Sequence, residues 1–389
     1  MAVIRRLVAP QVQPVVSTTA VEPETTITAP PQEMREPASS SPTSGQEKSG
    51  GSRGKSRGGF TPRDLYQEVT DRIVEAIENG TAPWQQMWDG QALWPLNGST
   101  TKPYHGINVM LLAGAGYQDP RWCSYQQAKD RGWQVKRDEH GTKIYFYKPL
   151  NRKTGEIDPE TQEPETKTIP ILKSYTVFNF SQIEGVPELE RRNAHAREVD
   201  DLTEQICQEL VDATGADIVY GQRRAAYSPS QDRVYMPDKE SFESDAHFYT
   251  TLLHELSHWT GHTSRLKREF GPDRNSEQYA REELRAEMAS AMLSLRLGLP
   301  SKVDGHSAYV DHYLKILRND KKEIFRAAKD AERMARYVLS FHPEFREEFE
   351  AEHQAQMVAH IEAGGPEEIF DASDFDFETD DLLLMGAKP

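Results

Sequence analysis

Apolar residues recur at helical spacing in the segment that follows residue 60. They stand four positions apart, at Leu65, Val69, Ile73 and Ile77, with polar residues between them. This spacing predicts an amphipathic helix over residues 62–79. Thr61 precedes a proline and is expected to cap the start of the helix, Asp64 places negative charge in the first turn, and Gly80 is expected to end it.

Strand-like sequence follows this helix. Aromatic and β-branched residues are concentrated in 143–150 and 174–180. Residues 151–167 are rich in charge, proline and glycine, so we expect a mobile insertion there. One helix followed by several short strands predicts a small α+β domain over residues 61–190.

A second pattern begins near residue 195. An extended stretch over 216–237 is preceded by one helical segment and followed by longer ones, two of which end at glycine. The predicted helices are 197–213, 245–260, 277–297 and two between 306 and 340. A short sheet followed by helices indicates a second α+β domain over 195–345, so the predicted fold class is α+β with two domains.

The two ends of the chain lack these patterns. The 389 residues carry a formal net charge of −16, and a hydrophobic content of 37% is low for one globule. Residues 1–60 are rich in Pro, Ser and Gly and predict a disordered arm, whereas residues 346–389 form an acidic tail. Residues 341–389 alone carry −12, with Phe and Leu interspersed. This composition is that of a nucleic-acid mimic, and a simply solvated tail is the alternative.

Composition also excludes several classes of protein. No apolar run approaches the ~18 residues of a transmembrane helix, so no membrane partner is expected. The start of the chain has too few apolar residues for a secretory signal. Cys123 and Cys207 are the two cysteines, far apart in the chain. They exclude a disulfide scaffold and a thiolate zinc finger, and they fit the reducing cytoplasm.

The sharpest chemical signal is the sequence HELSH in the predicted helix 245–260. His254 and His258 are one turn apart on the same helix face, so both imidazoles can reach one metal ion. Glu255 projects beside that face and is the candidate catalytic base, which takes a proton from water that the metal activates. The alternative is a pair of surface histidines, which the leucines around the motif disfavour because they give the helix a packed side.

A catalytic zinc site needs a third protein ligand. His262 lies beyond Gly261, where the helix should end, and is a poor candidate. The next predicted helix has Glu283 and Glu287 one turn apart. We expect Glu283 to bind the metal and Glu287 to hydrogen-bond a ligand histidine. The reverse assignment stays open, and so does the alternative that both glutamates are surface charges paired with arginines. Zn²⁺ is the expected ion, and Mn²⁺ is an alternative.

Aromatic and basic residues are interleaved in residues 84–147. This stretch contains eleven aromatic residues, including five of the six tryptophans in the chain. Single-stranded nucleic acid is held by base stacking on aromatic rings and by cations along its backbone, although most tryptophans of a small domain belong to its core. The candidate DNA-binding residues are Trp84, Trp88, Lys102, Tyr104, Trp122, Lys129, Arg131, Lys136, Arg137 and Lys143.

Long motifs in a fixed order make the chain resemble the ArdC-type antirestriction proteins of conjugative plasmids. They include PYHGINVMLL and SYTVFNFSQIEGV in the first half, and HELSHWTGHTSRLKR and YAREELRAE in the second. The resemblance covers roughly residues 61–340 and leaves out both tails. One departure is RDEHG at residues 137–141, where the family usually has a Gly-Glu-Lys-Gly-like turn.

The resemblance implies an N-terminal domain that binds single-stranded DNA and a C-terminal zincin-like metallopeptidase domain. It favours a cytoplasmic antirestriction protein that protects incoming plasmid or phage DNA. Two other functions stay open. One is an active metallopeptidase whose protein substrates are bound to DNA, and the other is a DNA-binding protein whose metal is purely structural.

Overall fold

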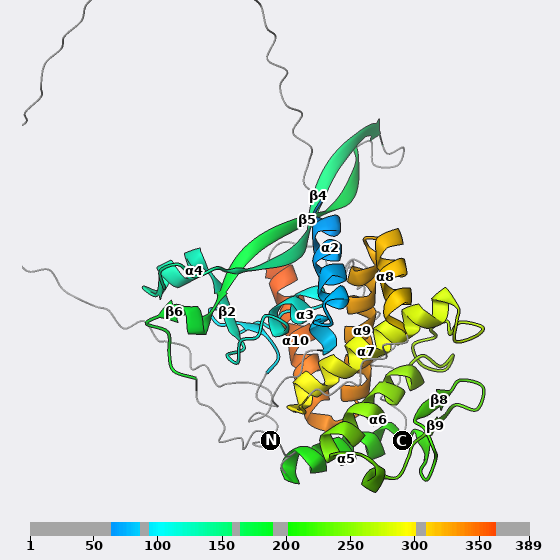
Figure 1. Ribbon diagram of the computed structural model, residues 1–389. Helices are drawn as coiled ribbons and strands as arrows, with labels where there is room; N and C mark the ends of the chain where they lie inside the picture. Colours follow the sequence, from blue (N-terminus) through cyan, green and yellow to red (C-terminus); the bar gives the residue numbers. More distant parts are fainter. Residues whose placement is uncertain (1–63, 86–92, 158–163, 190–200, 301–308, 363–389) are drawn as a thin grey trace, which may run out of the picture. The chain divides into compact units, whose positions relative to one another are not determined.

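The structure, a computed structural model, describes residues 64–85, 93–157, 164–189, 201–300 and 309–362 (Figure 1). Thr61, Trp88, the predicted arm 1–60 and the acidic tail from residue 363 onward lie outside these ranges. Among the helices within them, none is both long and apolar enough to cross a membrane.

The first described helix, α2 (Leu65–Glu78), buries the apolar stripe that the sequence predicts. Its N-cap is Asp64, whose carboxylate accepts a hydrogen bond from the backbone N–H of Gln67 at 3.2 Å. The helix therefore starts three residues later than predicted, because this aspartate caps the helix instead of lying in its first turn. Gly80 follows the helix in the left-handed conformation, with φ at 66°, and ends it as expected.

A four-stranded sheet in the order β1-β2-β5-β4 lies in the first half of the chain. β1 runs parallel to β2, and the other neighbouring pairs are antiparallel. The elements are β1 (Leu96–Asn97), α3 (Ile107–Ala113), β2 (Arg121–Ser124), α4 (Tyr125–Asp130), β4 (Thr142–Ile157) and β5 (Pro164–Asn179). A separate two-stranded sheet pairs β3 (Gln134–Val135) with β6 (Ile183–Glu184).

Strands β4 and β5 form one long hairpin (Figure 1). Their pairing extends from Thr142 opposite Val177 to Ile157 opposite Pro164, with a register shift after Lys153. The prediction of a mobile insertion over 151–167 is therefore wrong for residues 151–157 and 164–167, which belong to β4 and β5. Hydrogen bonds between the strands pair the backbone N–H and C=O groups of this charged segment. Such pairing depends little on side-chain type, so amino-acid composition does not reveal it.

The second half contains a small sheet and a set of packed helices. The sheet order is β7-β9-β8, with β7 parallel and β8 antiparallel to β9. The elements are α5 (Asp201–Thr214), β7 (Asp217–Val219), β8 (Ala226–Ser228), β9 (Arg233–Tyr235), α6 (Asp245–Trp259), α7 (Glu277–Leu297), α8 (Val310–Asn319), α9 (Glu323–Leu339) and α10 (Pro343–Glu362). α6 and α7 agree with their predicted bounds to within one residue. The boundary predicted for the acidic tail, at residue 346, falls inside α10.

One large apolar cluster runs through both halves of this α+β protein. Trp84 from the first half and Leu253 from the second belong to the same buried cluster. The indole N–H of Trp84 donates a hydrogen bond to Glu287 of α7 at 3.0 Å. Glu332 of α9 accepts a hydrogen bond from the backbone N–H of Gly106 at 2.6 Å. The described residues accordingly fall within one compact unit.

Candidate metal centre

Helix α6 places the predicted metal-binding motif inside the protein. The helix is capped by Ser244, whose hydroxyl accepts a hydrogen bond from a backbone N–H of the first turn at 3.2 Å. The apolar side of the helix packs into the core, so His254, Glu255 and His258 are each only 7% exposed. The Nε2 atoms of the two histidines are 3.2 Å apart. The helical spacing thus brings two ligand atoms to one point.

Helix α7 brings a carboxylate to the same point. Glu283 is buried, with Oε1 3.5 Å from Nε2 of His258 and Oε2 3.7 Å from Nε2 of His254. The three ligand atoms lie within 4.8 Å of one another. Ligand atoms of a tetrahedral zinc ion are about 3.3 Å apart when its bonds are ~2.0–2.1 Å long. Two imidazoles and one carboxylate at these separations fit a divalent ion.

Charge in the site matches this use. Burial opposes protonation of His258, but the carboxylates of Glu283 and Glu282 outweigh it and raise the pKa of His258 to about 10. Burial likewise opposes ionisation of Glu283, and the two histidines more than offset it, so the pKa of this carboxyl lies well below its usual range. The buried site therefore favours a positive charge next to Glu283, and a bound divalent cation would supply that charge.

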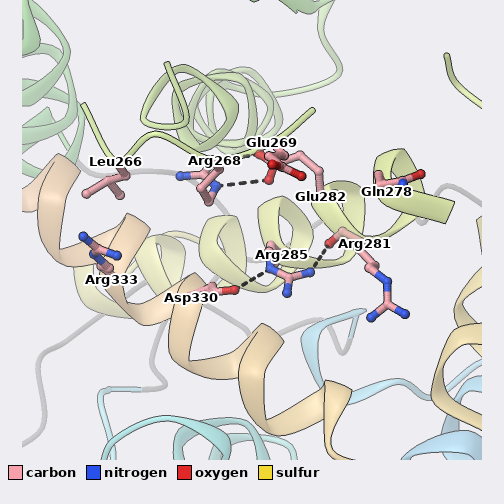
Figure 2. A pocket seen from close by; sticks show the side chains of 9 residues that line it. All are labelled: Leu266, Arg268, Glu269, Gln278, Arg281, Glu282, Arg285, Asp330 and Arg333. Atoms are coloured by element: carbon pink, nitrogen blue, oxygen red, sulfur yellow. Dashed lines mark hydrogen bonds and ion pairs between the residues drawn. The ribbon is translucent and has the colours of Figure 1, made fainter. Parts of the chain in front are cut away.

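A second carboxylate supports His258 from the other side of its ring. Oε1 of Glu282 is 3.2 Å from Nδ1 of His258. Figure 2 shows Glu282 beside the guanidinium of Arg268, which donates to its two oxygens at 3.0 and 2.7 Å. Arg268 also donates to the Ser257 carbonyl at 2.8 Å, near the end of α6. An acceptor at Nδ1 fixes the ring orientation and the tautomer that leaves Nε2 as the ligand atom.

Glu282 and Arg268 were not among the residues predicted from the sequence. Glu282 precedes the predicted ligand in the chain, but helical geometry points adjacent residues in different directions, so its partner could not be read from spacing. Figure 2 shows the pair at the border of a pocket that Arg281, Arg285 and Asp330 also line.

The other candidates for the third ligand take different places. Glu287 is fully buried and accepts hydrogen bonds from the indole of Trp84 and the hydroxyl of Tyr313, each at 3.0 Å. His262 has Nδ1 at 2.8 Å from the hydroxyl of Ser264. Within the described part of the chain, the grouped ligand atoms are those of the two motif histidines and Glu283.

A cleft of about 680 Å³ opens at these residues and is lined by Glu255, the three grouped ligands and Tyr279. The ring of Tyr279 lies 5.8 Å from that of Tyr309, which also lines the cleft. Burial first, and then the charge and hydrogen bond of Glu283, raise the pKa of Tyr279 well above its usual range, so its hydroxyl is a donor. Tyr279 stands one turn before Glu283 on α7, and that spacing was the one sequence signal that could have identified it.

The predicted aromatic DNA contacts lie mostly in the core. Trp84, Trp122 and Tyr104 are at most 5% exposed. Their faces are covered by other side chains, so bases cannot stack on these rings in this conformation. The two tryptophans belong to the core, which was the alternative to DNA contact. Lys143 is half-buried and pairs with Glu68 of α2 at 2.7 Å, which offsets its charge.

The other predicted basic residues lie on the surface. The exposed ones are Lys102, Lys129, Arg131, Lys136 and Arg137. Arg131 donates to the carbonyl of Ser99 at 2.7 Å, and Lys136 donates to the carbonyl of Ser181 at 2.7 Å. Both acceptors are neutral carbonyl groups, so these bonds do not neutralise the positive charge of Arg131 or Lys136. Both side chains remain candidates for phosphate contacts.

Two family models match the chain in separate stretches. Residues 63–178 match the "N-terminal domain of anti-restriction factor ArdC", and residues 205–330 match a "Zincin-like metallopeptidase" domain. The order of the two matches is the order of the two sheet-and-helix patterns described above.

Whole-chain comparisons agree with these matches. A crystal structure of the antirestriction ArdC protein from plasmid R388, metal-free, is 41% identical with a TM-score of 0.60, covering 72% of this chain and 98% of that one. Its Mn(II)-bound form is 39% identical with a TM-score of 0.57, covering 73% and 100%. A DNA primase TraC of Escherichia coli is 40% identical over 72% of this chain, which spans 27% of the primase. The uncharacterized protein y4eC of Sinorhizobium fredii is 33% identical over 72% of this chain and 92% of its own length.

Proposed function

Because the chain belongs to the ArdC family of antirestriction proteins, we propose that it binds single-stranded DNA and protects incoming plasmid or phage DNA from restriction. The observation that carries this proposal is the match of both family models in ArdC order, together with 98% coverage of an ArdC chain at 41% identity. The exposed basic side chains of residues 102–137 supply cations for the phosphate backbone.

We place this activity in the cytoplasm. The two cysteines, Cys123 and Cys207, are both free and buried. Burial raises the pKa of the Cys123 thiol to about 11 and that of Cys207 still further, so both thiols stay protonated and unreactive. Free buried thiols suit a reducing compartment.

The metal of the second half is proposed to be Zn²⁺, held by His254, His258 and Glu283. Mn²⁺ is the alternative, because an ArdC crystal structure is described as Mn(II)-bound. A divalent ion held there would supply Lewis-acid activation of water and of a carbonyl group. Glu255 lines the cleft beside these ligands and is the proposed base for the proton of that water. The Tyr279 hydroxyl lines the same cleft and can donate a hydrogen bond to a substrate oxygen.

A second candidate function is proteolysis of proteins bound to DNA. The size of the cleft favours it, because 680 Å³ at the proposed base and metal ligands can accept a segment of polypeptide. A metal site with a purely structural role would not need such an opening. In this reading DNA recruits the protein substrate.

The variant Glu255→Gln separates these functions. It keeps the size of the side chain and removes the base, so the three metal ligands stay in place. Restriction protection of single-stranded DNA entering a recipient would be measured beside cleavage of DNA-bound proteins. Antirestriction by DNA binding alone predicts full protection by the variant, whereas protection through proteolysis predicts that protection is lost while DNA affinity is unchanged. Protection without any DNA affinity in the unsubstituted protein would refute the proposal.

A further inference from the structure

Two exposed aromatic rings lie side by side on the long β4–β5 hairpin. Phe146 of β4 is 43% exposed and Tyr175 of β5 is 49% exposed. Their ring centroids are 5.9 Å apart and the rings are inclined at 65°, in an edge-to-face pair. Ile171 of β5 is also exposed, at 37%. Large exposed apolar side chains are uncommon, and a group of them on one element marks a binding surface.

The strand register explains why these side chains share one face. Phe146 stands opposite Lys173, and Ile144 stands opposite Tyr175. Directly opposed residues, and residues two apart along a strand, project from the same side of a sheet. Among the side chains that the structure describes, the exposed ones on this face are Phe146, Ile171, Lys173 and Tyr175, which we call the hairpin face.

The hairpin face continues a buried face of the sheet. Ile144 and Val177 lie on the same side, one step toward the base of the hairpin, and pack with Tyr104 and Trp122 in a small core cluster. Phe146 is the next residue outward, 6.4 Å from the ring of Tyr104. The core thus covers the base of this face and leaves the rings of Phe146 and Tyr175 partly exposed to solvent. Phe146 also contacts the buried Tyr104 at the edge of the core.

Charge on the hairpin has the opposite sign to that of the chain. β4 and β5 together contain six Lys or Arg residues and two Glu residues, in a protein with a net charge of −16. Lys173 is exposed on the hairpin face, opposite Phe146 and two residues before Tyr175, and no acidic side chain pairs with it among the residues that the structure describes. A basic strand pair with exposed rings is complementary to a polyanion that also carries flat apolar groups, which is the chemistry of an unpaired nucleic acid.

We propose that the hairpin face is the platform on which bases of single-stranded DNA stack, with Phe146 and Tyr175 as the stacking rings and Lys173 as a phosphate contact. This inference rests on the proposed function and names the surface that performs it. Stacking on a ring face does not distinguish one base from another, so the platform binds DNA without sequence preference. Duplex DNA keeps its bases stacked on one another and cannot use the rings.

The test measures binding of a fluorescent single-stranded oligonucleotide to the full chain by anisotropy at several salt concentrations. The variant Phe146→Ala/Tyr175→Ala should weaken binding at least tenfold, since loss of one stacked base costs about 5- to 150-fold in affinity. It should leave the salt dependence unchanged, because no charge is removed. Lys173→Ala should reduce the slope of log K against log salt by about 0.7. Tyr175→Phe keeps the ring and should bind as the unsubstituted protein does.

Tyr220→Ala is the matched control, because Tyr220 is 44% exposed and lies just after β7 in the other half of the chain. It should not change DNA affinity. If the unsubstituted protein fails to bind single-stranded DNA, the proposed function itself is wrong. If that protein binds and the double alanine variant, folded by circular dichroism, binds equally well, the stacking platform is wrong while the proposed function stands. Loss of self-association in the double variant, with DNA affinity intact, would also overturn it and assign the face to contacts between copies.

Discussion

Replacing Glu282 by glutamine tests how the metal site is held. The carboxylate lies 3.2 Å from Nδ1 of His258, is 2% exposed, and accepts two hydrogen bonds from Arg268. A glutamine has one acceptor oxygen. If that oxygen faces Arg268, the amide N–H₂ faces His258 and favours the tautomer with its proton on Nε2, where it blocks the ligand atom.

The expected size of the effect follows from these contacts. Groups that hydrogen-bond a ligand histidine typically contribute about 10- to 100-fold to metal affinity, or about 1.4–2.8 kcal/mol. Arg268 keeps its bonds to the Ser257 carbonyl and the Thr260 hydroxyl, so the local backbone should hold. We therefore expect Glu282→Gln to fold and to bind Zn²⁺ about 10- to 100-fold more weakly.

The assay is competition for Zn²⁺ against a chromophoric chelator at fixed pH. Glu269→Gln is the control, because Glu269 is exposed, lines the same pocket as Glu282 (Figure 2) and makes the same change of charge. It should leave the affinity within about twofold of the original. A Glu282→Gln protein with the same affinity as this control would refute the argument and mean that packing alone orients the His258 ring.

Further predictions concern the ligands, the shared core and the tail. His254→Ala or His258→Ala should abolish stoichiometric metal in elemental analysis, and Glu283→Ala should weaken it more than Glu287→Ala; the reverse order would exchange the two glutamates. Trp84→Phe should cost about 1–3 kcal/mol in unfolding free energy, because it removes the indole donor to the buried Glu287 carboxylate, and should not change DNA affinity. The pKa of His105 is raised, since the charge of Glu332 outweighs burial, and the pKa of Glu332 is lowered by His105 against burial. The loss of thermal stability in Glu332→Gln should therefore be largest between the ordinary pKa values of 4.5 and 6.5 and should shrink as pH rises through the raised pKa of His105. Ending the chain near Gly364 should tighten DNA binding at low salt, with the difference fading as salt rises, if the acidic tail competes with DNA; equal affinities at low salt would mean a solvated tail.

The candidate metal site shows what local sequence can and cannot determine. The i, i+4 spacing was enough to pair His254 with His258, because both lie on one helix whose geometry is fixed. Glu283 and Glu287 share a face of the next helix, so the choice between them depends on which turn of α7 lies opposite α6. Tertiary packing makes that choice, and it turns Glu287 toward Trp84 and Tyr313. The support from Glu282 depends on the same packing.

The aromatic residues also show that burial could not be predicted from composition. Composition pointed to the tryptophans of residues 84–133, since they are the largest rings in a basic stretch. Burial reverses that choice, because Trp84 and Trp122 fill the core whereas Phe146 and Tyr175 stay exposed. The exposed rings lie where the hairpin extends beyond its covered base. Phe146 and Tyr175 lie in the segments 143–150 and 174–180, which the sequence predicts as strands, but composition does not show which strand residues the core leaves exposed.

Helix α7 links the two proposed activities physically. It carries Glu283 at the proposed metal site and, one turn later, Glu287, which accepts the indole N–H of Trp84 from the first half of the chain. A fragment that ended near residue 190 would expose the Trp84 ring and leave its N–H without this acceptor. A fragment that began near residue 195 would leave the buried Glu287 carboxylate with one donor fewer. Each fragment would lose part of the shared core, so DNA binding and metal binding have to be compared in the whole chain, by single substitutions that leave this contact in place.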